Sequence, residues 1–175
     1  MLYYKKKCGK KLHAENETIE PFKKVTVQLP IYNEKFVLER LINSVCELNY
    51  PKDKLEIQVL DDSIDETTEI ANKIVREKRT LGFNIALLHR TNRVGFKAGA
   101  LAEGMKNSTG EFIAIFDADF IPKKDFLQKT LKYFTSDKIG MVQSRWEYLN
   151  EKESLLTKVQ AYGLNGHFVI EQSIR

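Results

Sequence analysis

Short apolar segments alternate with longer amphipathic segments along most of this 175-residue chain. Runs rich in β-branched and aromatic side chains predict strands at residues 25–29, 55–60, 83–88, 112–116 and 140–144. Apolar residues at helical spacing predict helices at residues 34–48, 65–79, 97–107, 125–134 and 154–162. Parallel strands need long crossover connections, which helices supply. The alternation therefore predicts an α/β fold with a doubly wound, mostly parallel, Rossmann-like sheet.

Two boundary signals refine this prediction. Pro30 is expected to end the first strand, because proline cannot donate a hydrogen bond within a sheet. Residues 163–175 end the sequence inside a patterned segment, whereas chain termini usually lie at element ends or in loops. We therefore expect the sheet to be incomplete at the C-terminus.

The positive charge of the chain is concentrated near its N-terminus. Residues 1–24 contain seven lysines and three glutamates, which accounts for the whole net charge of +4. We therefore divide the chain into a basic N-terminal arm, residues 1–23, and a domain, residues 24–175. The domain is electrically balanced, which argues against a nucleic-acid-binding face on it. A membrane-adjacent segment, an RNA contact or a solvated tail would each suit the arm.

Acidic residues follow two of the predicted strands. Asp61 and Asp62 follow residues 55–60, and Asp117 and Asp119 follow residues 112–116. The carboxyl ends of parallel strands meet at one edge of a sheet, where ligands bind in open α/β folds. Crowded carboxylates repel one another unless a cation compensates them, and hard oxygen ligands favour Mg²⁺ or Mn²⁺. The plainer alternatives are a solvated turn at Asp117–Asp119 and a helix N-cap cluster at Asp61–Asp62.

A glycine-bearing turn opens the predicted helix at residues 97–107. Free N–H groups at a helix N-terminus, together with the ammonium group of Lys97, favour a phosphate there. Neither the Walker spacing nor the GxGxxG spacing is present. Phosphate-binding groups beside a metal site point to a nucleoside diphosphate.

Five motifs, taken in order, resemble those of the family 2 inverting glycosyltransferases. They lie at residues 25–34, 59–63, 95–101, 116–119 and 142–146. The last of these is similar to the cellulose-synthase-like branch, especially the mannan and glucomannan synthases. The resemblance covers residues 24–175 and implies a GT-A fold that transfers a sugar from a UDP- or GDP-linked donor to a glycan or lipid acceptor.

The resemblance also implies roles for individual residues. Asp62 is expected to bind the nucleobase edge, Lys97 the diphosphate, Asp119 the metal, and Asp117 the ribose or the metal. The other residues expected to bind the nucleotide sugar are Pro30, Tyr32, Asn33, Glu34 and Asp61.

The second half of the family's machinery is not recognisable in this sequence. Inverting transfer needs a general base, which the family places on a later acidic motif of the Thr-Glu-Asp type, and no such motif is present. Glu147 and Glu171 are not assigned as that base. The Arg145-Trp146 pair belongs to the earlier element, not to the acceptor-holding motif of processive members. We therefore expect residues 24–175 to be the donor-binding part of an enzyme whose remaining parts hold it at the cytoplasmic face of a membrane.

Two alternatives remain open at this point. The chain could be a non-catalytic, truncated protein that only binds nucleotide sugars. It could also be an aspartate-nucleophile phosphotransferase, although that class carries its Asp-x-Asp motif after the first strand and has Thr or Val where this chain has Ile121.

Overall fold

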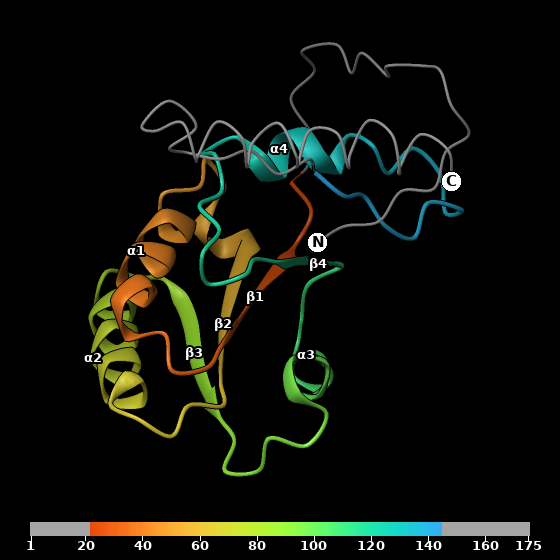
Figure 1. Cartoon of the computed structure of the whole chain (residues 1–175). Helices are drawn as coiled ribbons and strands as arrows, with labels where there is room; N and C mark the ends of the chain where they lie inside the picture. Colours follow the sequence, from red (N-terminus) through yellow and green to blue (C-terminus); the bar gives the residue numbers. More distant parts are fainter. Residues whose placement is uncertain (1–21, 145–175) are drawn as a thin grey trace, which may run out of the picture.

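The computed structural model describes residues 22–144, which form one parallel four-stranded sheet with helices on both faces (Figure 1). The strands are β1 (Val25–Ile31), β2 (Leu55–Asp61), β3 (Asn84–His89) and β4 (Phe112–Ile115), in the order β3-β2-β1-β4. All three neighbouring pairs are parallel. The predicted α/β class and parallel sheet are confirmed.

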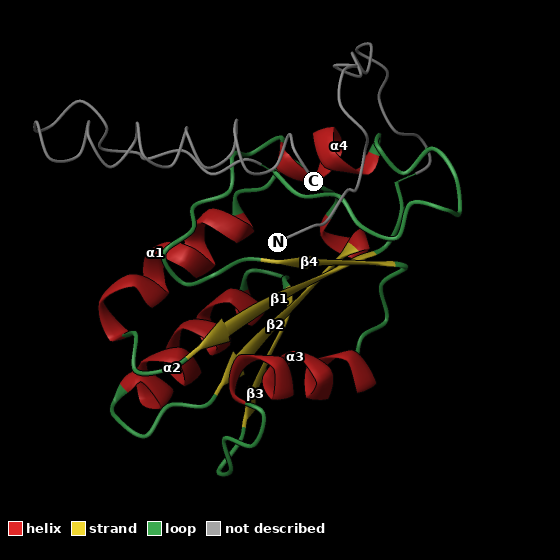
Figure 2. Cartoon of the chain, turned by 45° about the vertical axis from the view of Figure 1, so that its right-hand side comes forward, coloured by secondary structure: helices red, strands yellow, loops and turns green. Residues whose placement is uncertain are grey.

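Helices lie between consecutive strands, as parallel pairing requires, and one more helix follows the last strand. They are α1 (Lys35–Cys46), α2 (Thr67–Thr80), α3 (Phe96–Lys106) and α4 (Phe126–Leu131), with a short 3-10 helix, η1 (Lys52–Lys54), before β2. Figures 1 and 2 show α1 and α2 on one face of the sheet and α3 on the other. No helix among residues 22–144 is long and apolar enough to span a membrane.

The hydrophobic core lies between the sheet and the helices α1, α2 and α4. Alternate residues of β1 point into it, because successive side chains of a strand face opposite sides. Leu38 and Leu41 of α1 and Leu127 of α4 meet these residues in one continuous cluster. Each fully buried Val or Leu stabilises the fold by about 1.5–3 kcal/mol.

The opposite face of the sheet, beneath α3, is more polar than the short apolar segments of the sequence suggest. Gln28 and Gln58 are buried there, and the Gln28 Nε2 atom donates a 3.0 Å hydrogen bond to Gln58 Oε1. Gly104 of α3 lies over this pair, and a Cβ at this position would be 2.6 Å from Gln28 Nε2. The absence of a side chain at Gly104 lets the helix approach the amide pair closely.

Pro30 lies inside β1 and does not end it, so that expectation is wrong. Residues Val25 to Gln28 pair with β4, whereas β1 pairs with β2 as far as Ile31. Gln28 O accepts a hydrogen bond from Phe116 N–H on the β4 side, and Pro30, two residues on, faces the same side. Because the ladder with β4 has ended there, the missing N–H of Pro30 interrupts no strand pairing.

Residues 140–144 form no strand, which contradicts a second expectation. Gly140 offers no side chain to pack, and Val142 supplies the segment's one β-branched side chain. Ile139 and Gly140 instead line an apolar groove of about 370 Å³ beside β4 and α4. The predicted helix at residues 154–162 lies outside the described residues.

Candidate functional site

The strand order places the switch point of the sheet between β1 and β4. The chain passes from β1 to β2 to β3 in one direction and then crosses back to place β4 on the other side of β1. In open α/β sheets, the carboxyl ends of the strands that flank such a point border the ligand-binding crevice. Glu34 follows β1 and the Asp117–Asp119 turn follows β4, so acidic side chains border this crevice from both sides.

The acidic groups at the switch point influence one another. Burial raises the pKa of Glu34, and repulsion from Asp119 and Asp117 raises it further, whereas Lys97 lowers it. The Glu34 Oε2 atom is buried and has no hydrogen-bond partner among the described residues. Lys97 Nζ forms an ion pair with Asp117 Oδ1. The structure thus brings Glu34, Lys97, Asp117 and Asp119 into one local electrostatic field, and a cation would relieve its excess negative charge.

A divalent cation fits the donor set at Asp117 and Asp119. Among residues 22–144, no group of three or more His, Cys, Asp or Glu side chains is close enough to hold a metal by itself. Mg²⁺ is commonly bound through one or two carboxylates, with water and substrate phosphates as the remaining ligands. Two Asp side chains beside Glu34, whose Oε2 atom has no hydrogen-bond partner among the described residues, match that mode of binding, and they would leave coordination positions for a phosphate.

The loop after β1 is fastened to the loop after β2. Asn33 has a left-handed backbone, with φ at 55°, which Asn tolerates better than most residues. Its N–H donates a 2.9 Å hydrogen bond to Ser63 Oγ, and its Oδ1 atom accepts a 3.0 Å hydrogen bond from Ile64 N–H. Asn33 therefore sets the shape of the crevice wall.

Asp61 lies at the end of β2 and is fully buried. Its carboxylate accepts hydrogen bonds from Ser63 N–H at 2.9 Å and Thr68 Oγ1 at 2.6 Å, and it contacts His89 Nδ1 at 2.8 Å. Three contacts from its own surroundings hold this carboxylate in place. Asp61, which the sequence analysis expects to bind the nucleotide sugar, thus anchors the ends of β2 and β3 in the structure.

Asp62 is held by Arg90, a residue to which the sequence analysis gives no role. Arg90 Nε donates to Asp62 Oδ1 at 2.7 Å, and Arg90 Nη2 donates to Asp62 Oδ2 at 2.5 Å. The hydrogen bond to Asp62 raises the pKa of Arg90. The signal available in the sequence was the position of Arg90 directly after a strand, on the same sheet edge as the acidic residues.

The Tyr32 ring forms a cation–π contact with Arg93. The Arg93 guanidinium carbon lies 3.3 Å from the Tyr32 ring centroid and 5.3 Å from that of Phe96. This stack connects the loop after β1 with the loop after β3, across the end of β2. The loops after all four strands therefore contribute side chains to the same edge of the sheet.

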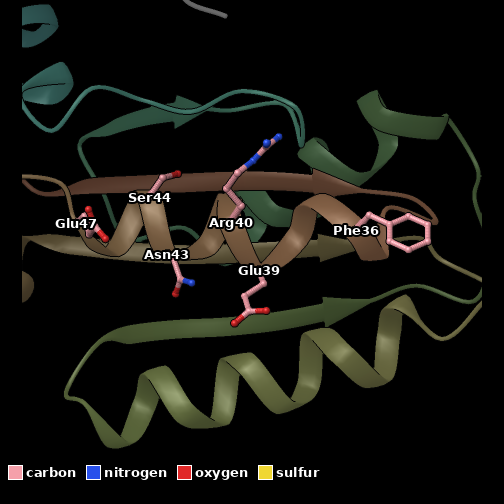
Figure 3. Close-up of a pocket in the computed structure, with 6 residues that line it drawn as sticks. All are labelled: Phe36, Glu39, Arg40, Asn43, Ser44 and Glu47. Atoms are coloured by element: carbon pink, nitrogen blue, oxygen red, sulfur yellow. The ribbon is translucent and has the colours of Figure 1, made fainter. Parts of the chain in front are cut away.

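A hollow that is separate from the switch point lies along the outer face of α1. It has a volume of about 450 Å³ and is lined by Phe36, Glu39, Arg40, Asn43, Ser44 and Glu47, whose side chains fan outward from the helix (Figure 3). None of these residues belongs to the cluster of carboxylates at the switch point. We therefore place the candidate site at the carboxyl edge of the sheet and not in this hollow.

Four residues discussed for their chemistry lie outside the described residues: Arg145, Trp146, Glu147 and Glu171. The same holds for the basic arm as far as residue 21.

Comparisons with known proteins match most of this chain. The sequence model of "Glycosyl transferase family 2" matches residues 26–173. The chain is 44% identical over 156 residues to a probable glucomannan 4-beta-mannosyltransferase 11 of Arabidopsis thaliana, covering 86% of this chain and 35% of the relative. It is 42% identical over 158 residues to glucomannan 4-beta-mannosyltransferase 1 of Oryza sativa subsp. japonica, covering 87% and 30%. The chain thus spans about a third of the length of these relatives.

Two solved structures share the fold and part of the sequence. The mannosyltransferase PcManGT from Pyrobaculum calidifontis, in complex with GDP-Man and Mn²⁺, has a TM-score of 0.60 and 33% identity, covering 66% of this chain and 33% of that one. Residues 1–349 of S. aureus TarS have a TM-score of 0.54 and 27% identity, covering 63% and 32%.

Proposed function

This chain belongs to glycosyltransferase family 2 and has a GT-A-like α/β fold, and on that premise we propose that its switch-point crevice binds GDP-mannose with a divalent cation for mannosyl transfer. One observation carries the proposal: the Asp117–Asp119 turn, Lys97 and Glu34 share one electrostatic field at the switch point. The choice of GDP-mannose over a UDP-linked sugar is supported by the similarity to PcManGT and to the glucomannan mannosyltransferases.

Each described residue of the crevice has a task in this proposal. Asp62 binds the nucleobase edge, while Pro30, Tyr32 and Asn33 line the nucleoside pocket. In this proposal Asp61 does not touch the donor but holds the ends of β2 and β3 in register, because its carboxylate is buried and already has three contacts within the protein.

The diphosphate lies between α3 and the turn after β4. Asp119 and Asp117 would hold Mn²⁺ or Mg²⁺, which supplies Lewis-acid neutralisation of the diphosphate. Lys97 leaves Asp117 for a phosphate oxygen and stabilises the negative charge that develops on the departing GDP. Glu34 keeps the cation-binding region electronegative before the donor arrives.

The reaction is a single displacement at the anomeric carbon, with inversion. The acceptor hydroxyl forms the new C–O bond, the bond between the anomeric carbon and the β-phosphate oxygen breaks, and GDP leaves with the bonding electrons. A general base takes the hydroxyl proton, and we assign no residue among 22–144 to that role. We propose a glycan acceptor, with a lipid-linked one as the alternative, and a site on the cytoplasmic face of a membrane. The lysines of residues 1–23 support that side, because Lys and Arg accumulate on it.

Calorimetry on the full 175-residue chain tests the donor site. GDP-mannose should bind in the presence of Mn²⁺ and much more weakly in its absence, and UDP-glucose should compete poorly. Loss of a partner of a metal ligand already costs about 10- to 100-fold in affinity, so Asp119→Asn should cost at least that much. Asp53→Asn is the matched control, because η1 lies at the opposite, amino-terminal edge of the sheet. A wild-type chain that binds neither nucleotide sugar with Mn²⁺ would refute the proposal.

A transfer assay addresses the non-catalytic alternative. GDP-[¹⁴C]mannose and a manno-oligosaccharide acceptor should yield a longer oligosaccharide if the chain suffices for catalysis. Donor binding without product would favour a chain that only binds nucleotide sugars. The aspartate-nucleophile phosphotransferase alternative is wrong, because the family match assigns the chain elsewhere.

A further inference from the structure

We propose that Arg90 is a positioning residue that couples the nucleobase end of the donor site to its diphosphate end. This inference rests on the proposed function and extends it to a residue outside the five motifs. The Arg90 side chain lies between Asp62 on one side and the turn that opens α3 on the other.

Arg90 fixes the orientation of the Asp62 carboxylate. Its Nε and Nη2 atoms donate to the two different oxygens of Asp62, at 2.7 and 2.5 Å. Asp62 is buried, with a side chain only 4% exposed, and its N–H donates to Ile31 O. A paired, planar contact of this kind sets both the position and the tilt of a carboxylate. The face that Asp62 presents to a nucleobase therefore depends on Arg90.

The same guanidinium supports the turn before α3. Arg90 Nη1 donates to Val94 O at 3.3 Å, and Arg90 Nη2 donates to Phe96 O at 3.1 Å. Gly95 and Phe96 are both left-handed, with φ at 74° and 49°. Glycine adopts that conformation readily, but a residue with a Cβ is strained there. Phe96 therefore needs outside support, and the hydrogen bond from Arg90 provides it.

Gly99 makes room for this arrangement. A Cβ at Gly99 would lie 2.0 Å from Val94 O and 2.9 Å from Arg90 Nη1. Lys97, directly after Phe96, forms the ion pair with Asp117. A continuous path of contacts thus runs from Asp62 through Arg90 and the turn to Lys97, and a change at either end alters the support of the other.

Arginine suits this place better than lysine. An ammonium group can meet one Asp62 oxygen, but it cannot hold both oxygens and two carbonyls in one plane. Arg90→Lys therefore preserves the charge and removes the coupling. Arg79→Lys is the matched control, because Arg79 also supports a carbonyl, Ile85 O at 2.6 Å, but forms no contact with the crevice residues.

The test is a double-mutant cycle on the full chain, with GDP and Mn²⁺ as the probe and calorimetry as the readout. The variants are Asp62→Asn, Lys97→Met and the double variant, each in the wild-type and in the Arg90→Lys background. Contacting networks couple by about 2-fold or more in affinity. In the wild-type background, we expect the loss of GDP affinity in the double variant to differ by at least about 3-fold from the product of the two single losses. In the Arg90→Lys background, we expect the double variant's loss to equal that product. A purely structural role would lower the melting temperature and leave the coupling unchanged.

The outcomes separate this inference from the proposed function. A wild-type chain that does not bind GDP with Mn²⁺ overturns both. Normal GDP binding with unchanged coupling in Arg90→Lys overturns the role of Arg90 alone. Equal effects of Arg79→Lys and Arg90→Lys on the coupling overturn it as well. If circular dichroism shows that Arg90→Lys does not fold, the cycle in the wild-type background tests the inference by itself. A double variant whose loss of GDP affinity equals the product of the two single losses then overturns the inference.

Discussion

Two glycines of α3, Gly99 and Gly104, offer a sharp test of how this fold builds its donor site. They are five residues apart on one helix, and each is packed too closely to accept a side chain. Gly99 faces Val94 in the turn just before Lys97, whereas Gly104 faces the buried amides of Gln28 and Gln58. Alanine at Gly99 should therefore impair donor binding, and alanine at Gly104 should impair stability.

The magnitudes follow from the distances. A Cβ at Gly99 would lie 2.0 Å from Val94 O, whereas ordinary contact begins at 3.4 Å, so the carbonyl must retreat by about 1.4 Å. Moving Lys97 out of reach of the diphosphate removes a charged hydrogen bond worth about 1.5–3 kcal/mol, so we expect Gly99→Ala to lower GDP-mannose affinity by about 10- to 100-fold. Alanine gains about 1 kcal/mol in helix propensity over glycine, which offsets part of the strain in the overall stability.

At Gly104 the clash is with buried groups of the sheet. A Cβ would lie 2.6 Å from Gln28 Nε2 and 2.9 Å from both Gln58 Oε1 and Leu60 Cδ2. Overpacking costs about 1–3 kcal/mol, and a broken buried hydrogen bond costs about 1–3 kcal/mol more. After the propensity gain, the free energy of unfolding should fall by about 1–5 kcal/mol. Donor affinity of the folded fraction should remain unchanged.

Urea unfolding and calorimetry with GDP-mannose and Mn²⁺ measure the two quantities separately. The expected result is a crossed pattern: Gly99→Ala loses affinity and keeps most of its stability, and Gly104→Ala loses stability and keeps its affinity. If both variants lost affinity in proportion to stability, the separation of α3 into a site-forming end and a packing end would be wrong.

Three further predictions concern the scaffold and the phosphate end of the site. Burial raises the pKa of Glu56, but hydrogen bonds from Thr26 and Thr109 outweigh it together and hold this pKa below its ordinary value of 4.5. The carboxylate therefore stabilises the fold above about pH 4.5, and the stabilisation is lost as pH falls through the lower folded-state value. Glu56→Gln should flatten that part of the acid-unfolding curve followed by circular dichroism, and an unaltered curve would contradict this prediction. Leu41→Ala, at a fully buried position of α1, should lower the free energy of unfolding by about 2–5 kcal/mol. Phe36 is 90% exposed on the same helix, so Phe36→Ala should change the free energy of unfolding by no more than about 0.5 kcal/mol. Similar urea midpoints for the two variants would be inconsistent with the core described. Lys97→Met should weaken GDP binding by about tenfold or more, as expected for the loss of a charged hydrogen bond. The affinity for guanosine, which has no phosphate, should not change. An equal loss of affinity for both ligands would exclude a phosphate-specific role of Lys97.

Much of the fold was open to prediction because it depends on local patterns. A strand needs a short run that suits a pleated surface, and a helix needs apolar residues at helical spacing. Both signals lie within a few consecutive residues, so β1 to β4 and α1 to α4 were found with small errors at their ends. The strand predicted at residues 140–144 was wrong, because this segment has one valine and otherwise weak strand formers.

The candidate site was predictable in its position along the chain but not in its contacts. Acidic residues directly after two strands led to the prediction of a cation at the carboxyl edge of the sheet, which stays a prediction. The sequence did not reveal that the Asp61 carboxylate accepts hydrogen bonds from Ser63 and Thr68. Nor did it assign Arg90 to Asp62, because the two residues are 28 positions apart and meet only after β2 and β3 have paired.

The sequence by itself therefore indicated most of the elements, the parallel character of the sheet and the edge at which the acidic residues gather. The tertiary structure alone decided the strand order, which put Glu34 opposite Asp117 and Asp119 and allowed Pro30 to lie within a central strand. The physical reason is one of range. Periodicity and propensity act between near neighbours in the chain, whereas the pairing of charges and the matching of surfaces depend on which distant segments the packing of the core brings together.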